Sequence, residues 1–285
     1  MYFLNIFKPK GITSFDVIRE LRKRLKIRSI GHSGTLDPLA SGVLQVAVGS
    51  ATKLLDFLPS DKTYIAEIKF GFVSTTYDEE GEKSFVKEPK FSIDELKNVI
   101  NTFVGKTQQI PPKYSAIKIS GQKLCDIARK NPSQEIEIKP REIEIYSIEL
   151  LEFKNDFAKI KVHCKKGVYI RSLVNDIGEK LSCGAYMTNL ERIKAGKFNI
   201  ENSSYLDSDL KEINPLDALD MEIFELNDEQ YLKISHGNFI ENNQKFKNEY
   251  ILLTKNKKLV SIAKMSDNLI KPKKFFGGHI DGYFF

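Results

Sequence analysis

The sequence predicts an α+β fold with a largely antiparallel sheet, followed by a small β-rich C-terminal domain. Segments with the two-residue alternation of strands do not alternate one for one with segments of helical spacing, which argues against a doubly wound parallel sheet. A polar stretch at residues 202–215 separates a long N-terminal part from a short tail. The length of 285 residues suits two unequal domains, which we expect at 1–210 and 211–285.

The first elements are a helix and two strands. Ser14 is expected to cap the helix, because apolar residues at helical spacing follow it. Basic residues occupy the opposite face of this helix. A strand is expected at 43–48, after a glycine-rich loop, and a second at 64–70, where apolar and polar residues alternate.

A second helix and an insertion follow. The capping box formed by Ser92 and Glu95 starts this helix, and Gly105 is expected to end it. Residues 107–141 are interrupted by prolines. We expect them to form an irregular surface insertion, with a short helix near 124–128.

The periodic patterns return after this insertion. Alternating apolar residues predict strands at 143–145 and 158–164, and helical spacing predicts a helix at 173–181. In the tail, two apolar runs at 250–253 and 259–263 flank a short polar turn, which is typical of a β-hairpin.

The composition fits a globular protein with a sizeable core. Hydrophobic residues make up 41% of the chain and charged residues 29%. No apolar run approaches the ~18 residues of a membrane span. The three cysteines show no Cys-x-x-Cys spacing, and the four histidines are scattered. We therefore expect a cytoplasmic protein with reduced thiols and no metal site.

The positive charge is concentrated near the N-terminus. Residues 8–28 contain eight basic residues against Asp16 and Glu20, which equals the whole net charge of +6. Such a patch is typical of a surface that binds phosphates. The alternative is a solvated helix face whose basic end favours the helix dipole.

Residues 31–44 place one carboxylate, Asp37, in a loop rich in glycine. Pro38 biases Asp37 toward extended backbone, and the glycines permit turns that other residues would block. The spacing excludes a phosphate-binding P-loop, because no lysine follows Gly34, and also a Gly-x-Ser-x-Gly nucleophile elbow. A turn without function is the alternative.

The Asp37 loop resembles the signature of the bacterial tRNA pseudouridine-55 synthases, the TruB family. Further segments resemble motifs of that family in the same order: 8–14, 61–64, 112–118, 166–173, 183–185 and 190–192. Cys125 and Glu191 depart from the family pattern, which puts local RNA contacts in question. The resemblance covers about residues 3–200 and implies the pseudouridine synthase fold, with a long mixed sheet and a small PUA-like C-terminal domain.

The resemblance also implies an activity without a cofactor, the isomerisation of uridine 55 in the T-loop of tRNA. It assigns Asp37 as the catalytic carboxylate and Arg171 as the cation that orients it. Tyr64 would stack on the uracil, and Tyr169 would lie beside the base and ribose. Alternation along an extended segment would point Tyr169 and Arg171 to one face. For both tyrosines, packing in the core is the alternative.

Further residues are expected to bind the substrate. The resemblance places His32 in the space that the flipped uridine leaves and Leu190 in the wall of the pocket. The insertion at 107–141 is expected to grip the RNA, and the basic residues expected to meet phosphates are Lys8, Arg22, Lys23 and Lys26. We expect tRNA as the partner, with the protein acting as a monomer without a metal or a membrane.

Three alternatives remain open. A synthase of the same fold could act on another RNA, including a guide-RNA-dependent relative, although the tail is short for that role. A non-catalytic RNA-folding factor would not need Asp37, Tyr64, Tyr169 and Arg171 together. A glycoside hydrolase would need a second acid, for which Asp78 is available outside the motifs.

Overall fold

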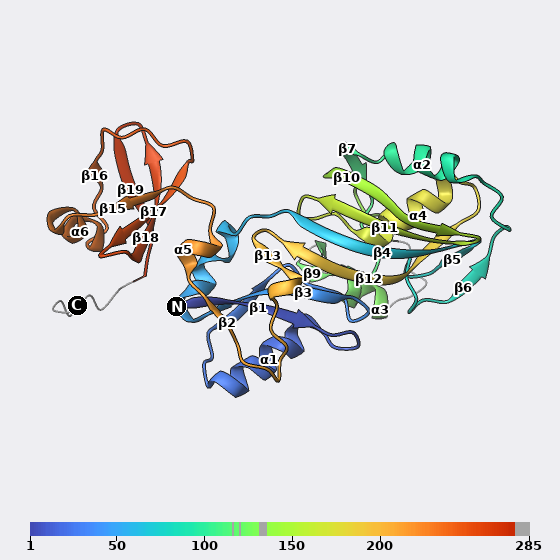
Figure 1. Ribbon diagram of the computed structural model, residues 1–285, viewed down its shortest axis with the longest axis horizontal. Coiled ribbons are helices and arrows are strands. Elements are labelled where there is room, and N and C mark those ends of the chain that lie inside the picture. Colours follow the sequence, from blue (N-terminus) through green and yellow to red (C-terminus); the bar gives the residue numbers. More distant parts are fainter. Residues whose placement is uncertain (116, 120, 131–135, 277–285) are drawn as a thin grey trace.

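The computed structural model describes residues 1–115, 117–119, 121–130 and 136–276. It shows an elongated molecule with the C-terminal domain at one end and the helices α2 (Ile93–Asn101) and α4 (Ile170–Lys180) at the other (Figure 1). Ala116 in one family motif, residues 131–135 of the expected insertion and residues 277–285 of the tail lie outside the described residues.

A large mixed sheet of ten strands forms the floor of the molecule. Its main path runs β14-β1-β3-β12-β4-β11-β10-β7, with β2 paired to β3 and β13 to β12. The described pairings are antiparallel except for that between β12 and β3. The strands of this sheet are β1 (Tyr2–Lys8), β2 (Ile30–Ser33), β3 (Ser41–Val48), β4 (Lys62–Phe70), β7 (Gly105–Gln109), β10 (Arg141–Lys154), β11 (Phe157–Cys164), β12 (Ala185–Ala195), β13 (Phe198–Asn199) and β14 (Glu212–Ile213).

Helices cover different parts of this sheet because each buries one apolar face. The helix α1 (Ser14–Leu25) packs Val17, Ile18 and Leu21 against β1 and β3. The helices α2 (Ile93–Asn101) and α4 (Ile170–Lys180) pack on the inward residues of β4, β11 and β10. Every residue of β3 is buried, because apolar clusters cover both of its faces.

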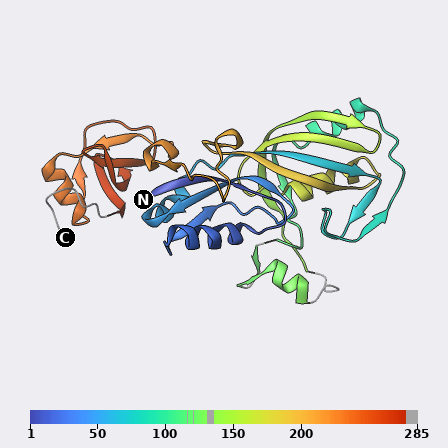
Figure 2. The ribbon, with the colours of Figure 1, turned by 60° about the horizontal axis from the view of Figure 1, so that its bottom comes forward.

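Two small hairpins extend the body. One consists of β5 (Phe72–Ser74) and β6 (Lys83–Phe85), and the loop between these strands reaches the pocket described below. The other consists of β8 (Lys118–Ile119) and β9 (Gln122–Lys123), followed by the helix α3 (Leu124–Lys130). Figure 2 shows that this second unit stands apart from the large sheet.

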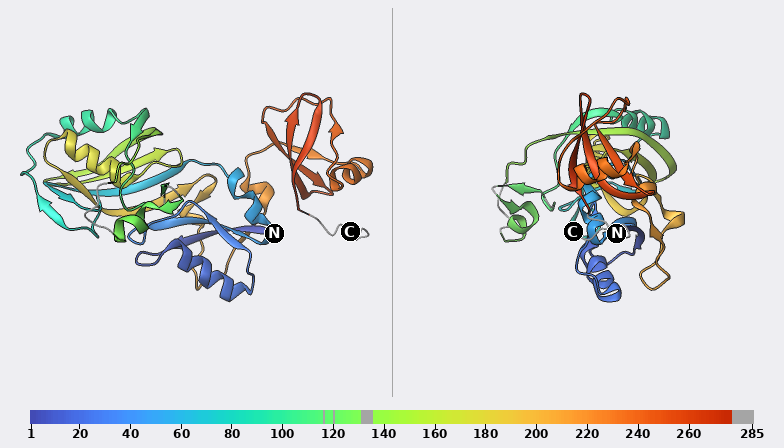
Figure 3. Two further views of the ribbon diagram at one scale, coloured as in Figure 1. Left: turned by 180° about the vertical axis from the view of Figure 1, so that it is seen from behind. Right: turned by 90° about the vertical axis from the view of Figure 1, so that its left-hand side faces the viewer.

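The C-terminal domain is a five-stranded sheet in the order β15-β17-β18-β19-β16, with the helix α6 (Asp228–Ser235) packed on it. It lies at one end of the molecule in both Figure 1 and Figure 3. Its Leu252 and Ile262 share an apolar cluster with Phe3 and Leu54 of the N-terminal part. The remaining elements are α5 (Pro215–Ala218), β15 (Ile223–Glu225), β16 (Ile240–Glu241), β17 (Tyr250–Lys255), β18 (Lys258–Ser266) and β19 (Leu269–Phe275).

Most predicted elements are confirmed, but several predicted boundaries were wrong. Thr13, not Ser14, caps α1, because Thr13 and Asp16 form a reciprocal capping box. The large sheet includes residues up to Ile213, because β14 pairs with β1.

The middle of the chain also differs from the expectation. The helix α2 ends at Asn101, and Gly105, with φ of +104°, starts the edge strand β7 instead of ending the helix. The irregular stretch therefore begins after Gln109, and the expected short helix is present as α3. The helix α4 begins at Ile170, three residues before the start that helical spacing predicted.

Candidate active site

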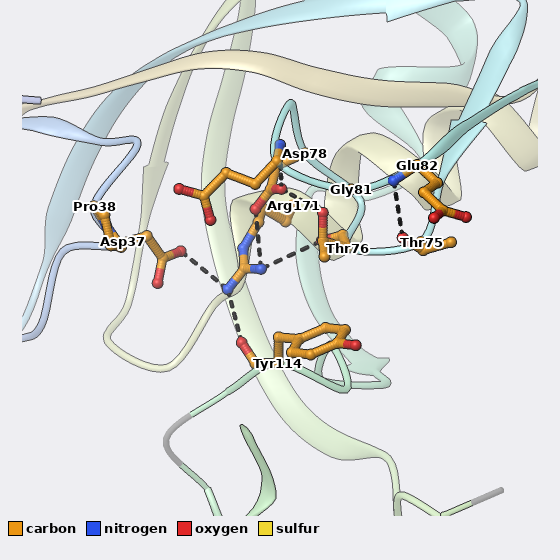
Figure 4. Close-up of a pocket in the computed structure, with 10 residues that line it drawn as sticks. Asp37, Pro38, Thr75, Thr76, Asp78, Gly81, Glu82, Tyr114 and Arg171 are labelled. Atoms are coloured by element: carbon orange, nitrogen blue, oxygen red, sulfur yellow. Dashed lines mark hydrogen bonds and ion pairs between the residues drawn. The ribbon is translucent and has the colours of Figure 1, made fainter. Parts of the chain in front are cut away.

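An open cavity of about 560 Å³ lies where four separate segments meet. These segments are the loop after β2, the loop between β5 and β6, the segment after β7 and the first turn of α4 (Figure 4). Four carboxylates and one guanidinium line it, so the wall is acidic overall. The lining residues are Asp37, Pro38, Thr75, Thr76, Asp78, Glu80, Gly81, Glu82, Tyr114 and Arg171.

Arg171 is the centre of this site (Figure 4). Its side chain is 6% exposed and lies between two carboxylates. The Nη2 atom is 3.0 Å from Asp37 Oδ2, and the Nη1 atom is 3.1 Å from Asp78 Oδ2. The guanidinium also donates to the carbonyls of Tyr114 at 3.0 Å and Thr76 at 3.3 Å. Because these partners come from different segments, Arg171 joins its own segment to the other three walls.

The two carboxylates beside Arg171 differ in access. The side chain of Asp78 is 2% exposed, whereas that of Asp37 is 39% exposed. Asp78 is also fixed by its own loop, since Oδ1 accepts hydrogen bonds from the Glu80 N–H at 3.1 Å and from the Thr76 hydroxyl. A buried carboxylate with these partners is suited to hold the guanidinium. Asp37 is therefore the acid that a ligand in the cavity can reach.

No motif in the sequence identified Asp78 as part of this site; its only signal was the cluster of acidic residues at 78–82. Ninety-three positions separate it from Arg171, and the fold brings the two together. It does not take the role of a second catalytic acid flanking a bond, because it is buried against the guanidinium.

The loop that carries Asp37 is anchored from the N-terminal segment. The carbonyl of Pro38 accepts a hydrogen bond from the Gly11 N–H at 2.8 Å. Lys8 is fully buried, and its Nζ atom donates to the carbonyls of Pro9 and Ile12, each at 2.8 Å. Burial lowers the pKa of Lys8 to about 8. Its Nζ atom also donates to the Pro38 carbonyl at 3.5 Å, so the buried Lys8 contacts the Asp37 loop and is not exposed at the surface, where a phosphate would bind.

Arg192 holds the ends of the same loop, and the sequence patterns assigned it no role although it lies in the motif segment 190–192. It is 1% exposed, and its guanidinium donates to the carbonyls of Val43 at 2.7 Å and Gly34 at 2.9 Å. Gly42 packs directly on the backbone of Arg192, and an added Cβ atom would lie 2.3 Å from its carbonyl oxygen. Gly42 has φ of +106°, so glycine is needed there for two independent reasons.

Tyr64 and Leu190 lie in the apolar cluster beside the cavity and are not among the residues that line it. Tyr64 is half-buried on β4, directly opposite Arg192 on β12. Burial raises the pKa of the Tyr64 phenol. Leu190 is 6% exposed in the same cluster, which also contains Leu36 next to Asp37.

Tyr169 occupies the position immediately before α4. Its backbone N–H donates to Gln109 Oε1 at 2.9 Å, and its carbonyl accepts from Gln109 Nε2 at 3.0 Å. Burial raises the pKa of its phenol. The expectation that Tyr169 and Arg171 alternate along an extended segment was wrong, because Tyr169 is extended and Arg171 is already helical.

His32 lies on β2, opposite Val46, and is half-buried. Burial, and secondarily the charge of Arg192, lowers the pKa of His32, so its imidazole is neutral at pH 7. His32 is not among the residues that line the cavity, and it lies on the strand that leads into the Asp37 loop.

The basic residues of α1 face away from the apolar cluster beneath the helix. Lys23 and Lys26 are exposed, whereas Arg22 donates to the Ile30 carbonyl at 3.0 Å and lies 5.7 Å from the ring centroid of Phe15. Arg22 thus combines surface charge with packing.

The described part of the chain offers neither a metal centre nor a spanning helix. No three His, Cys, Asp or Glu side chains among its residues lie where they could hold a metal ion together. None of the described helices has the length and apolar character needed to cross a membrane.

Comparisons with known proteins agree with this geometry. Residues 22–170 match the model of the TruB family pseudouridylate synthase N-terminal domain, and residues 171–231 match the tRNA pseudouridylate synthase B C-terminal domain. A protein of Clostridium acetobutylicum named tRNA pseudouridine synthase B is 50% identical over 212 residues, covering 74% of this chain and 72% of that protein. A protein of Mycoplasma mobile with the same name is 40% identical over 280 residues, covering 96% and 94%.

Solved structures share the fold. The protein chain in a crystal structure of a Cbf5-Nop10-Gar1 complex matches with a TM-score of 0.72 and 23% identity, covering 96% of this chain and 84% of that one. The mixed α+β pseudouridine synthase fold expected from the sequence is thus confirmed. Because the family models and the relatives span the cavity and all the segments that build it, the chain belongs to the TruB family of pseudouridylate synthases.

Proposed function

We propose that this protein isomerises uridine 55 in the T-loop of tRNA to pseudouridine. The observation that carries the proposal is the partly exposed Asp37 carboxylate, held 3.0 Å from the buried guanidinium of Arg171 at an open cavity. Membership of the TruB family, and relatives named tRNA pseudouridine synthase B, support the reaction and the substrate.

The reaction moves a base without changing its composition. The bond between the ribose C1′ and the uracil N1 breaks, and a bond between C1′ and C5 forms. The proton on C5 is lost and N1 gains one, so no atom or electron is gained or lost overall. The overall reaction therefore consumes neither an oxidant nor a reductant. Asp37 is the group proposed to act on the nucleotide, and Arg171 fixes its orientation.

The charge of the cavity favours a base over a phosphate. Its four carboxylates repel the RNA backbone, whereas a neutral uracil carries no charge to be repelled. A uridine in a folded tRNA must leave the base stack to reach Asp37, at a cost of a few kcal/mol. Tyr64 is proposed to stack on the flipped base and Leu190 to form the apolar wall beside it, with Tyr169 near the ribose. His32, as a neutral imidazole, is proposed to fill the vacated position in the RNA.

The rest of the tRNA is proposed to lie on the projecting elements. The exposed Lys23 on α1 and Lys26 directly after the helix suit the phosphates of an A-form stem. The unit of β8, β9 and α3, which stands apart from the large sheet, is proposed as a second contact (Figure 2). The protein is proposed to act on tRNA as a monomer, and a tRNA substrate supports a cytoplasmic location.

The test is incubation with unmodified tRNA, followed by mapping of pseudouridine at nucleotide resolution. We expect product at position 55 with the wild type and none with Asp37→Asn, which keeps the shape but loses the charge. The tRNA affinity of this variant should stay within about tenfold, because the lost group acts in the chemical step. The matched control is Asp156→Asn, since Asp156 is 38% exposed and paired with Lys69 outside the cavity.

Two results would contradict the proposal. Pseudouridine at another position would show that a nucleotide other than uridine 55 is the substrate. Turnover by Asp37→Asn at about a tenth of the wild-type rate would remove Asp37 from the chemical step.

A further inference from the structure

Ser14, the first residue of α1, makes two hydrogen bonds to Leu36, the residue that precedes Asp37. Its hydroxyl accepts a hydrogen bond from the Leu36 N–H at 2.8 Å and donates one to the Leu36 carbonyl at 3.0 Å. Ser14 is 1% exposed and Leu36 is 3% exposed, so water does not compete for these bonds. Both backbone groups of Leu36 therefore depend on a single hydroxyl that lies 22 positions earlier in the chain.

The residue after Asp37 is bound to the same segment. The Pro38 carbonyl accepts from the Gly11 N–H, and the Asp37 carbonyl accepts from the Ala40 N–H within its own loop. The backbone is thus fixed on both sides of Asp37, whereas the Asp37 carboxylate has an ion pair only from Arg171 among the described residues. The direction in which the carboxylate leaves the backbone is set from the segment 11–14.

That segment continues directly into the basic helix. Thr13 caps α1 through its capping box with Asp16, so reciprocal hydrogen bonds hold the start of the helix. Phe15, the next residue after Ser14, is 56% exposed, and the guanidinium groups of Arg19 and Arg22 lie 6.0 and 5.7 Å from the centroid of its ring. One end of α1 therefore holds the Asp37 loop, and its outer face carries aromatic and cationic groups.

We propose that Ser14 is a positioning residue for Asp37, which keeps the carboxylate in a fixed place relative to RNA bound on α1. This proposal rests on the proposed function, because it takes Asp37 to be the group that acts on the nucleotide. The hydroxyl itself is buried beneath the loop and contacts no substrate. Its loss should therefore slow the chemical step and leave the binding of tRNA nearly unchanged.

The test is Ser14→Ala, with the single-turnover rate at saturating tRNA and the dissociation constant measured separately. We expect the rate to fall about ten- to hundredfold, because small displacements of a reacting group are costly. The dissociation constant should change by less than about threefold, since the basic face of α1 is unaltered. Ser14→Thr keeps the hydroxyl, and recovery of the rate in this variant would show that the hydrogen bonds carry the effect.

The matched control is Ser261→Ala in the C-terminal domain. Ser261 is fully buried, and its hydroxyl donates to the Lys274 carbonyl at 3.0 Å, in a domain that contributes no residue to the cavity. It should lower the melting temperature as Ser14→Ala does and leave the single-turnover rate unchanged. All rates are measured well below the melting temperature of each variant, so that partial unfolding does not contribute.

Each outcome decides the proposal. A single-turnover rate of Ser14→Ala within twofold of the wild type would overturn it, and so would a loss confined to tRNA affinity. If the wild type itself forms no pseudouridine in tRNA, the proposed function fails instead, and this result is obtained before any variant is compared.

Discussion

The two sides of the cavity are held by different chemistry. On one side, the Arg171 guanidinium is buried between Asp78 and the carbonyls of Thr76 and Tyr114. On the other side, the loop that carries Asp37 is held by neutral backbone groups, through Ser14 and Gly11. The ion pair between Asp37 and Arg171 joins the two sides across the cavity.

This difference separates charge from position. On the guanidinium side, the buried Arg171 and Asp78 depend strongly on each other, because either charge would be costly to bury alone. This pair keeps a positive charge beside Asp37. The loop side fixes geometry with neutral hydrogen bonds, which do not compete with Asp37 for Arg171. A carboxylate held in this way is accessible from the cavity, while hydrogen bonds hold the backbone on both sides of it.

The largest expected effect is on the charged side. Arg171→Leu leaves the buried Asp78 carboxylate unpaired, so the free energy of unfolding should fall by about 3–5 kcal/mol. The double variant with Asp78→Leu should recover much of this loss, because no buried charge remains. Denaturant unfolding of the single and double variants measures both values.

The same measurement on Asp37→Asn provides the contrast. Asp37 is 39% exposed, so its loss should change the free energy of unfolding by less than about 1 kcal/mol. A loss as large as that of Arg171→Leu would mean that the two sides are not held differently.

A smaller effect is expected from Lys8 beneath the loop. Burial lowers its pKa from 10.5 to about 8, so between these values the unfolded chain binds more protons than the folded one. The contribution of Lys8 to stability should therefore increase as the pH rises above about 8, by at most about 1.4 kcal/mol per pH unit. The measurement is the difference in unfolding free energy between the wild type and Lys8→Met at a pH of about 7.5 and of about 9.5. A difference that stays constant with pH would show that burial does not lower the pKa of Lys8.

The smallest effect on the chemical step is expected from the outer face of α1. Replacing Lys23 and Lys26 with Ala should weaken tRNA binding, and the slope of log affinity against log salt should flatten by about 0.7–0.9 for each phosphate that the variant no longer neutralises. Arg22 is left in place, because its bond to the Ile30 carbonyl also supports the helix. The single-turnover rate at saturating tRNA should not change. An unaltered salt slope would show that this face does not meet the RNA.

The sequence alone determined the elements with regular periodicity and the residues in recognisable motifs. The helices α1, α2 and α4 and the strands β4 and β11 follow from apolar spacing, since each buries one face. Asp37 and Arg171 lie in motif segments, and the structure brings them to 3.0 Å from each other.

The strand β12 shows where periodicity failed. It was not predicted, although it lies between β3 and β4 in the middle of the large sheet. Register shifts after Met187 and after Arg192 interrupt the alternation of its buried residues twice. A pattern broken in this way does not reveal a strand, because each bulge moves the following side chains to the other face.

Only the tertiary structure decided which polar residues support the site. Lys8 looked like a phosphate ligand and is a buried support, and Ser14 looked like a helix cap and holds the Asp37 loop. The spacing of residues did not predict the partners of Asp78 and Arg192, because these partners lie 93 and 149 positions away. Hydrogen bonds and ion pairs act over a few ångströms, and the fold, not the order of residues, sets which groups come that close.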